Sequence, residues 1–346
     1  MQRRSSSRRF HRAFILFVLA VTTASLTSAQ DKVDKPPELK LSTAQGPAFA
    51  LGKAGERWAQ LINDAAGGAF EVKQYPGAIL AWRDPGREFG ALKDGAADLA
   101  VGSALAWSAQ LTVFGVYALP WLASEQREQE ALAANAPLRE LVAAQADRAG
   151  IIVLAVAPLG DRVVATMKGA VHAPAEMVGL RVRVIPNPIV IETFAALGSR
   201  PTAMGFADAQ AAFLAGTLDG QEAAPSTLAA TRIAAVGQKY VTRWGAFADV
   251  MVFAVRRATW DAWNERHRTA VRSAANDAAR EAEALAREEM ASTELTKQGV
   301  TIVRLTAAQR MAFRAAVQPV WDKWTPPIGV ELVRAAEAAV MAAAIK

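Results

Sequence analysis

Apolar residues follow two different periods along this chain. From about residue 38, short stretches in which every second residue is apolar are followed by longer stretches in which apolar residues recur every three or four positions. The first period is typical of strands and the second of helices. The first cycle comprises a strand at 39–41, a helix at 51–65 that ends at Gly67-Gly68, and a strand at 70–75.

The same alternation continues through most of the chain. Helices are expected at 85–94 and, as one segment, at 124–149, with strands at 99–102 and 151–154. The cycle restarts after residue 160, with strands at 162–166, 180–184 and 202–204 and helices at 188–197 and 207–215. Repeated strand-helix alternation predicts an α/β fold with helices covering a sheet. The restart predicts a second lobe.

Two long segments in the last third of the chain connect these lobes. Residues 240–256 form an apolar, strand-like run that returns the chain to the first sheet. Thr259 is the predicted N-cap of one long amphipathic helix through Leu285, which is long enough to lie across both lobes. The remaining chain is helical, with a break expected at Pro326-Pro327.

Residues 1–29 have the pattern of a cleavable signal peptide. Five arginines are followed by the apolar run 13–21 and then by small residues up to Ala29. The alternative, a membrane anchor, would need about 20 apolar residues, and this run is much shorter. Arg8-Arg9 fits a twin-arginine signal poorly, so Sec export is favoured. Without a cysteine for a lipid anchor, the exported protein is predicted to be periplasmic.

Composition removes several classes of function. The first 29 residues hold five of the 39 basic residues and none of the 33 acidic ones, so their removal lowers the formal charge from +6 to +1 and leaves no basis for nucleic-acid binding. The absence of cysteine excludes thiolate chemistry. The spacing of His172 and His267 matches no metal-binding motif, and no glycine motif for a nucleotide is present. The close spacing of the two carboxylates Asp219 and Glu222 is explained by a turn at Gly220. We therefore expect no cofactor, no metal and no catalytic residue.

Arginine inside apolar strands is the feature that points to binding. Arg183 lies in the middle of the apolar strand 180–185, and Arg162 begins another strand. A buried guanidinium requires an anionic partner. This partner is either an internal carboxylate or a bound ligand, and the residues alone leave both open.

Three ordered motifs resemble those of a known family. They are Gly179-Leu180-Arg181-Val182-Arg183-Val184, then Ala195 and Leu197-Gly198 with Pro201, Met204 and Phe206, then Ala215-Gly216-Thr217-Leu218-Asp219-Gly220-Gln221-Glu222. They are similar to the G-L-K-I-R-V-P, A-L-G-A-x-P-x-P-M-x-F and T-G-x-V-D-G-Q-E-N-P motifs of the solute receptors of tripartite ATP-independent periplasmic (TRAP) transporters, of the C4-dicarboxylate-receptor type. Weaker similarity covers nearly all of the chain after residue 29.

The resemblance implies an α/β periplasmic binding protein whose two lobes close on a ligand. We place lobe 1 at 38–160 plus about 249–290, and lobe 2 at 161–248 plus about 291–346. Arg183 occupies the place of the family arginine that forms a bidentate salt bridge with the substrate carboxylate. Arg162 matches a second cleft arginine. Phe206 matches an aromatic residue that lines the site, although ordinary core packing also explains a phenylalanine there.

One position departs from the family pattern. Ala223 stands where the family usually has an asparagine that donates to the substrate. We expect a small apolar space beside Arg183 and therefore a larger or less polar acid as ligand. Trp82 and Trp107 lie in segments that the family uses to face the cleft, and they are candidates to shape that space, with surface or core packing as the alternative.

The predicted function is capture of an organic acid anion in the periplasm for a TRAP-type transporter. The expected partners are a small carboxylate and the transporter's membrane subunits, with the receptor itself a monomer or a homodimer. One alternative is a receptor that presents its ligand to a membrane sensor. Another is a secreted α/β enzyme acting on small acids, which the scarcity of histidine and the absence of cysteine disfavour.

Overall fold

The computed structural model describes residues 35–344, apart from the side chains of residues 206 and 207. The predicted signal peptide lies outside the described residues. From residue 36 onward the chain is one compact unit. No helix among residues 35–344 is both long and apolar enough to cross a membrane.

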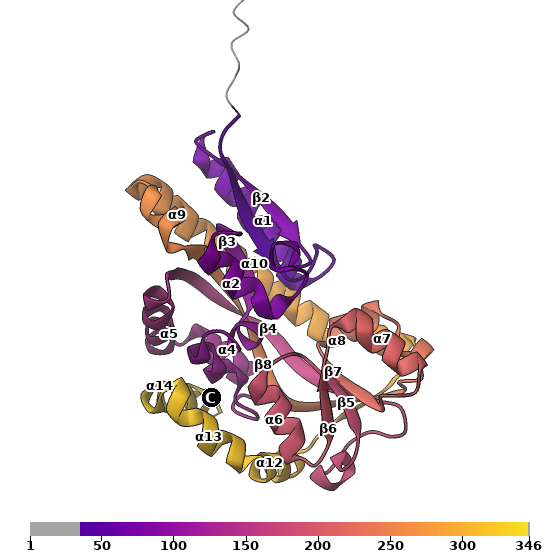
Figure 1. Cartoon of the computed structure of the whole chain (residues 1–346). Helices are drawn as coiled ribbons and strands as arrows, with labels where there is room; N and C mark the ends of the chain where they lie inside the picture. The colour runs from indigo at the N-terminus through magenta and orange to yellow at the C-terminus, as the bar shows by residue number, and fades with distance from the viewer. Residues whose placement is uncertain (1–34, 345–346) are drawn as a thin grey trace, which may run out of the picture. The chain divides into compact units, whose positions relative to one another are not determined.

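The elements follow one another as strands alternating with helices (Figure 1). The first part contains β1 (Glu38–Thr43), α1 (Ala50–Ala66), β2 (Glu71–Pro76), the short 3-10 helices η1 (Ile79–Ala81) and η2 (Pro85–Arg87), α2 (Glu88–Asp94), β3 (Leu99–Ser103), α3 (Ala104–Trp107), η3 (Thr112–Ala118), α4 (Gln126–Ala134) and α5 (Ala136–Arg148). The second part contains β4 (Ile151–Thr166), η4 (Pro174–Met177), β5 (Arg181–Val184), α6 (Pro188–Ala196), β6 (Arg200–Ala203), α7 (Phe206–Leu214), β7 (Gly220–Ala223), α8 (Pro225–Ala230) and η5 (Ile233–Val236). The chain ends with β8 (Tyr240–Arg256), α9 (Arg257–Ala262), α10 (Glu265–Ala291), α11 (Glu294–Lys297), β9 (Thr301–Arg304), α12 (Ala307–Ala316), α13 (Gln318–Ile328) and α14 (Val330–Ala344).

The nine strands found in residues 35–344 belong to one mixed sheet. Its order is β2-β1-β3-β8-β4-β7-β5-β6, with β9 paired to β8. Strands β1, β2 and β3 are parallel to one another, and so are β5, β6 and β7. The two parallel groups are joined through the antiparallel pair β4 and β8, as the apolar run 240–256 predicted. The strands of the two predicted lobes are therefore connected by these two long segments.

Strand β4 differs from the sequence prediction. Two separate strands were expected at 151–154 and 162–166, and Pro158 and Gly160 lie between them. The structure has one strand of 16 residues, Ile151–Thr166. Its pairing with β8 shifts register at three places, including Pro158/Gly160, where Gly160 adopts φ +112°. These bulges let the strand continue through residues that usually interrupt one.

The helix boundaries predicted from the sequence were wrong in three places, and each difference has a local cause. The single helix expected at 124–149 is two helices, because Asn135 caps α5 by accepting a hydrogen bond from the Leu138 amide at 2.9 Å. The long helix begins at Glu265, because Asn264 caps it through the amide of His267, while Thr259 lies within α9. Helix α13 continues through Pro326 and Pro327 to Ile328. It ends at Gly329, where φ is +116°.

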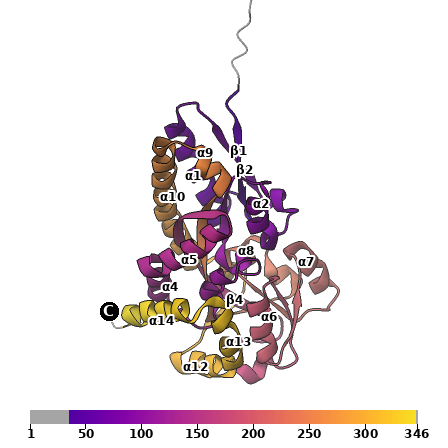
Figure 2. The ribbon, with the colours of Figure 1, turned by 60° about the vertical axis from the view of Figure 1, so that its left-hand side comes forward.

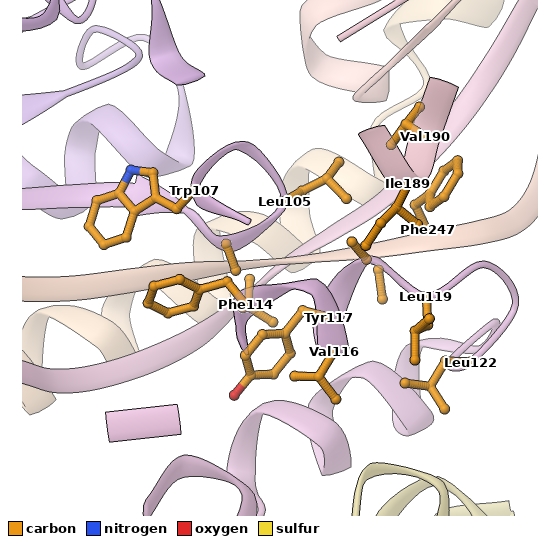
Figure 3. Packing of buried hydrophobic residues seen from close by; sticks show 14 of the residues in the cluster. Leu105, Trp107, Phe114, Val116, Tyr117, Leu119, Leu122, Ile189, Val190 and Phe247 are labelled. Atoms are coloured by element: carbon orange, nitrogen blue, oxygen red, sulfur yellow. The ribbon is translucent and has the colours of Figure 1, made fainter. Parts of the chain in front are cut away.

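Helices cover both faces of the sheet and divide the core. On one face, α1 and the 27-residue α10 pack together over β1, β3, β4 and β8 (Figure 2). Between these helices, the buried Trp58 donates from Nε1 to the carbonyl oxygen of Val271 at 3.3 Å. The other face carries a larger cluster that includes residues from both parallel groups, part of which is drawn in Figure 3. Helix α14 packs on α4 and α5, while α13 packs on η3 and α6. The C-terminal helices thus contact elements of both predicted lobes.

Candidate functional site

Arg183 is the buried cation that the sequence singled out. It lies near the carboxyl end of β5 and is 6% exposed. Its Nε donates to the carbonyl oxygen of Met204 at 3.0 Å, and its Nη1 donates to the carbonyl oxygen of Glu222 at 3.1 Å. Burial lowers the pKa of Arg183 to about 10; the charge of Glu222 opposes this shift and that of Arg162 adds to it. These contacts hold the guanidinium where three parallel strands end.

Arg162 is bound by an internal carboxylate. The side chain of Glu222 is fully buried, and its two carboxylate oxygens accept hydrogen bonds from Nε and Nη2 of Arg162, the second at 3.2 Å. Burial by itself lowers the pKa of Arg162, but the attraction and hydrogen bond of Glu222, with the charge of Asp249, raise it overall. The sequence left an internal carboxylate and a ligand open as partners, and for Arg162 the structure provides the carboxylate.

Asp249 connects this pair to the first parallel group. It lies on β8, is 2% exposed, and accepts hydrogen bonds from Ser103 Oγ at 2.6 Å and from the Leu105 amide at 3.2 Å. Burial raises its pKa, although Arg162, Ser103 and two backbone amides oppose the shift. Ser103 is the last residue of β3. Hydrogen bonds therefore link Asp249 on β8 to the end of β3, and the charge of Asp249 acts on Arg162 of β4.

These residues meet at the carboxyl ends of the two groups of parallel strands. Arg183 and Glu222 each precede the last residue of their strand, and Met204 follows β6 directly. In the other group, Thr43 and Ser103 end β1 and β3. Open α/β sheets bind ligands outside the carboxyl ends of their strands. The arrangement offers a buried guanidinium, backbone oxygens and hydroxyl groups, which suit the recognition of an anion.

The structure separates the two candidate tryptophans. Trp107 is completely buried, stacks edge-on with Phe89 and Phe114, and lies so close to Gly102 that a Cβ there would be 2.2 Å from its ring. Figure 3 shows Trp107 next to Phe114 within the cluster. Trp82 is 86% exposed and has φ +59°. The sequence named core and surface packing as alternatives to a ligand contact, and each tryptophan fits one of them.

Ala223 and Phe206 were the other predicted ligand residues. Ala223 is 1% exposed and packs in an apolar cluster with Val163 and Leu228. Side chains alternate along β7, so Ala223 and Gln221 lie on one face of the sheet and Glu222 lies on the other. Because Gln221 pairs with Arg183 of β5, Ala223 is on the same face as Arg183. Phe206 is the first residue of α7, and its side chain lies outside the described residues. A role for either residue in ligand binding stays a prediction.

Sequence reasoning did not assign Glu222, Asp249 and Met204 to the site. Asp249 is a single acid within the apolar run 246–255, so the argument used for Arg183 applies to it equally. Glu222 was explained by a turn that it shares with Asp219. The structure separates the two acids, because Asp219 bonds to Nε and Nη2 of Arg181, both at 2.9 Å, and this contact lowers the pKa of Asp219 to about 2.

A surface groove lies away from these residues. It has a volume of about 1090 Å³ and runs between α4, α10 and α14 over the middle of β4. Its walls carry charges of both signs, including Arg127 and Glu130. None of the predicted ligand residues lines it. Within residues 35–344, no group of histidine and carboxylate side chains is placed to hold a metal ion.

Comparison with known proteins decides the family. Residues 41–326 match the family described as bacterial extracellular solute-binding protein, family 7. This chain belongs to that family. Over 331 residues it is 27% identical to the C4-dicarboxylate-binding periplasmic protein DctP of Rhodobacter capsulatus, covering 93% of this chain and 96% of the relative. The resemblance seen in the sequence motifs is confirmed.

Solved structures of TRAP periplasmic solute-binding proteins have the same fold. A TRAP periplasmic solute-binding protein from Ralstonia eutropha, with bound (S)-2-acetolactate, is 39% identical and superposes with a TM-score of 0.83, covering 88% of this chain and 98% of the relative. One from Chromohalobacter salexigens, with bound D-glucuronate, is 24% identical with a TM-score of 0.80, over 87% of this chain and 99% of that protein. The chain is a TRAP-type solute-binding protein with the two-lobed periplasmic-binding fold, as the sequence predicted.

Proposed function

We propose that this protein captures an organic acid anion in the periplasm through Arg183 and delivers it to the membrane subunits of a TRAP transporter. The observation that carries the proposal is the position of Arg183: a largely buried guanidinium, fixed by two backbone carbonyls, at the ends of parallel strands in a solute-binding fold. A carboxylate matches the planar fork of a guanidinium in geometry and charge.

The energetics of burial support the same role. Burial lowers the pKa of Arg183 to about 10, because dehydration disfavours the charged guanidinium. A ligand carboxylate offsets this cost when it binds. Acids are therefore expected to bind more tightly than neutral molecules of the same shape.

Relatives support a carboxylate as the ligand class. The relative from Ralstonia eutropha holds 2-acetolactate, which has one carboxylate with neighbouring hydroxyl and oxo groups. The DctP protein of Rhodobacter capsulatus is named for C4-dicarboxylates. Both ligand types contain the group that Arg183 would bind. We place the ligand of this chain in the same class and assign it no chemical turnover.

Export and lobe division belong to the same proposal. Residues 1–29 would direct export and be removed, leaving a receptor without a lipid anchor. The lobes would divide near residues 160 and 248, where β4 and β8 connect the two parallel groups. Closure of the lobes would then bring Thr43 and Ser103 toward the ligand held by Arg183.

Identification of the bound ligand tests this function. The mature protein, expressed with its signal peptide and purified from the periplasm without denaturation, is analysed by mass spectrometry for small molecules that it releases on unfolding. A thermal-shift screen of carboxylic acids and their matched amides then ranks candidates, since a ligand raises the melting temperature by mass action. We expect acids to stabilise the protein and amides to fail. Stabilisation by neutral sugars or amines alone would refute the proposal.

A further inference from the structure

Two segments that leave the sheet beside the candidate site are joined across the predicted lobes. Asn187 follows the end of β5 in lobe 2 by three residues, and Leu105 follows the end of β3 in lobe 1 by two. The side-chain amide of Asn187 donates from Nδ2 to the carbonyl oxygen of Leu105 and, at 2.7 Å, to Oγ of Ser108. Asn187 therefore connects α6 to α3, although 79 residues separate it from Ser108 in the sequence.

The amide of Asn187 is fixed in orientation. Its Oδ1 accepts a hydrogen bond from the amide of Val190 at 3.1 Å, which caps α6 and leaves Nδ2 directed at lobe 1. Asn187 and Leu105 are completely buried and Ser108 is 7% exposed, so water does not replace these hydrogen bonds while the two helices are in contact. A buried acceptor that loses its donor destabilises the contact that buries it.

The peptide of Leu105 is held from two sides. Its amide donates to Oδ1 of Asp249 on β8 at 3.2 Å, while its carbonyl oxygen accepts from Asn187. On the lobe 2 side, Asn187 lies four residues after Arg183, and its backbone amide donates to the carbonyl oxygen of Ile185 at 2.7 Å in a tight turn. The contact between the lobes is thus made next to the buried guanidinium.

Apolar packing continues the contact one turn into α6. Ile189 is 2% exposed, and a Cβ built on Gly115 of η3 would lie 3.0 Å from its Cδ1. Figure 3 shows Leu105 of α3 and Ile189 of α6 as members of the same buried cluster. Helix α6 therefore fits closely against two elements of lobe 1 in this structure.

We propose that Asn187 is a positioning residue that holds the two lobes in this arrangement by donating to the Leu105 carbonyl and the Ser108 hydroxyl. Without these two donations, the acceptors regain hydrogen bonds only when the lobes separate and water reaches them. Loss of the amide therefore shifts the protein toward a more open arrangement. A smaller compact population also lowers the apparent affinity for any ligand that both lobes contact. The inference concerns the lobes themselves and does not depend on the proposed function.

Spin labels on the two lobes measure the arrangement directly. The chain contains no cysteine, so Lys93→Cys on α2 and Leu214→Cys on α7, both at exposed positions, provide unique labelling sites. The mature protein is freed of small molecules by unfolding and refolding, and double electron–electron resonance then gives the populations at the compact distance of this structure and at longer distances. In Asn187→Ser the ratio of compact to extended populations should fall at least about fivefold. Serine also caps a helix, but it lacks the amide donors.

Two further variants separate the link from the cap. Ser108→Ala removes one acceptor and should shift the ratio in the same direction by a smaller factor. Asn135→Ser changes the same kind of cap within lobe 1, where Asn135 accepts from the Leu138 amide at 2.9 Å, and should leave the ratio as in wild type. Circular dichroism confirms folding, and Ser108→Ala decides the question if Asn187→Ser does not fold.

Three results would overturn the inference. The first is an unchanged ratio in the folded variant of Asn187, or of Ser108 where that variant decides. The second is an equal shift in Asn135→Ser, which would assign the effect to helix capping in general. The third is a wild-type protein without a compact population, because the hydrogen bonds of Asn187 would then not hold the lobes together.

Discussion

Arg183 and Glu222 are joined through the main chain: Nη1 of Arg183 donates to the carbonyl oxygen of Glu222 at 3.1 Å, while the Glu222 carboxylate binds Arg162 on the opposite face of the sheet. One residue therefore fixes both arginines that the motifs identified. The carboxylate of Glu222 accepts from two nitrogens of Arg162, and its backbone oxygen accepts from Arg183. We assign the ligand carboxylate to Arg183 because this guanidinium is buried near the carboxyl end of β5.

Glu88 makes stability depend on pH. Its side chain is fully buried and accepts a hydrogen bond from Ser42 Oγ at 2.7 Å. Burial raises its pKa from 4.5 to about 7, while the hydrogen bond from Ser42 and the nearby indole of Trp107 oppose the shift. The folded state therefore holds a proton that the unfolded chain loses above pH 4.5, so this group destabilises the fold progressively as pH rises from 4.5 to 7.

Glu88→Gln removes this dependence, because an amide keeps a donor and an acceptor and does not ionise. Relative to wild type, the variant should gain about 2–3 kcal/mol in the free energy of unfolding at pH 8 and little at pH 4.5. Urea denaturation at both pH values measures the difference. The same difference at both pH values would show that Glu88 is not protonated in the folded state.

Truncation to alanine should reduce the stability of the protein much more at Trp107 than at Trp82. Trp107→Ala leaves a large cavity in the core and should cost about 3–5 kcal/mol of stability, whereas Trp82→Ala removes an exposed ring and should change stability by less than about 0.5 kcal/mol. Denaturation midpoints of both variants against wild type provide the test. A Trp107→Ala variant as stable as Trp82→Ala would contradict the packing described for the core.

Features within a single strand or helix were predictable from the sequence, whereas contacts between distant segments were not. The run 240–256 matched β8 to the residue, because buried apolar strands carry a direct signal. Arg183 was identified as a charge within such a strand. The partner of Arg162 is 60 residues away, and only the antiparallel pairing of β4 with β7 brings it near.

The ends of strands and helices were harder to predict, because neighbouring segments decide whether a given residue interrupts an element. Pro158 and Gly160 usually end strands, but a long antiparallel partner lets β4 continue through bulges. Trp82 and Trp107 have equivalent sequence signals, and only the packing of α3 against β3 separates core from surface. Asn264 replaced Thr259 as the cap of α10, since both are good capping residues and sequence alone ranks them poorly.

The most direct test of the account is the affinity of Arg183→Ala for the acid identified by mass spectrometry, measured by calorimetry beside wild type. Removal of a buried, charge-assisted contact should cost about 2–5 kcal/mol of binding free energy, a loss of about 30-fold or more, while the circular dichroism spectrum is unchanged. Arg183→Lys should not restore binding, because an ammonium cannot form the bidentate contact. An Arg183→Ala affinity within about threefold of wild type would contradict the account, since the carboxylate would then be bound elsewhere.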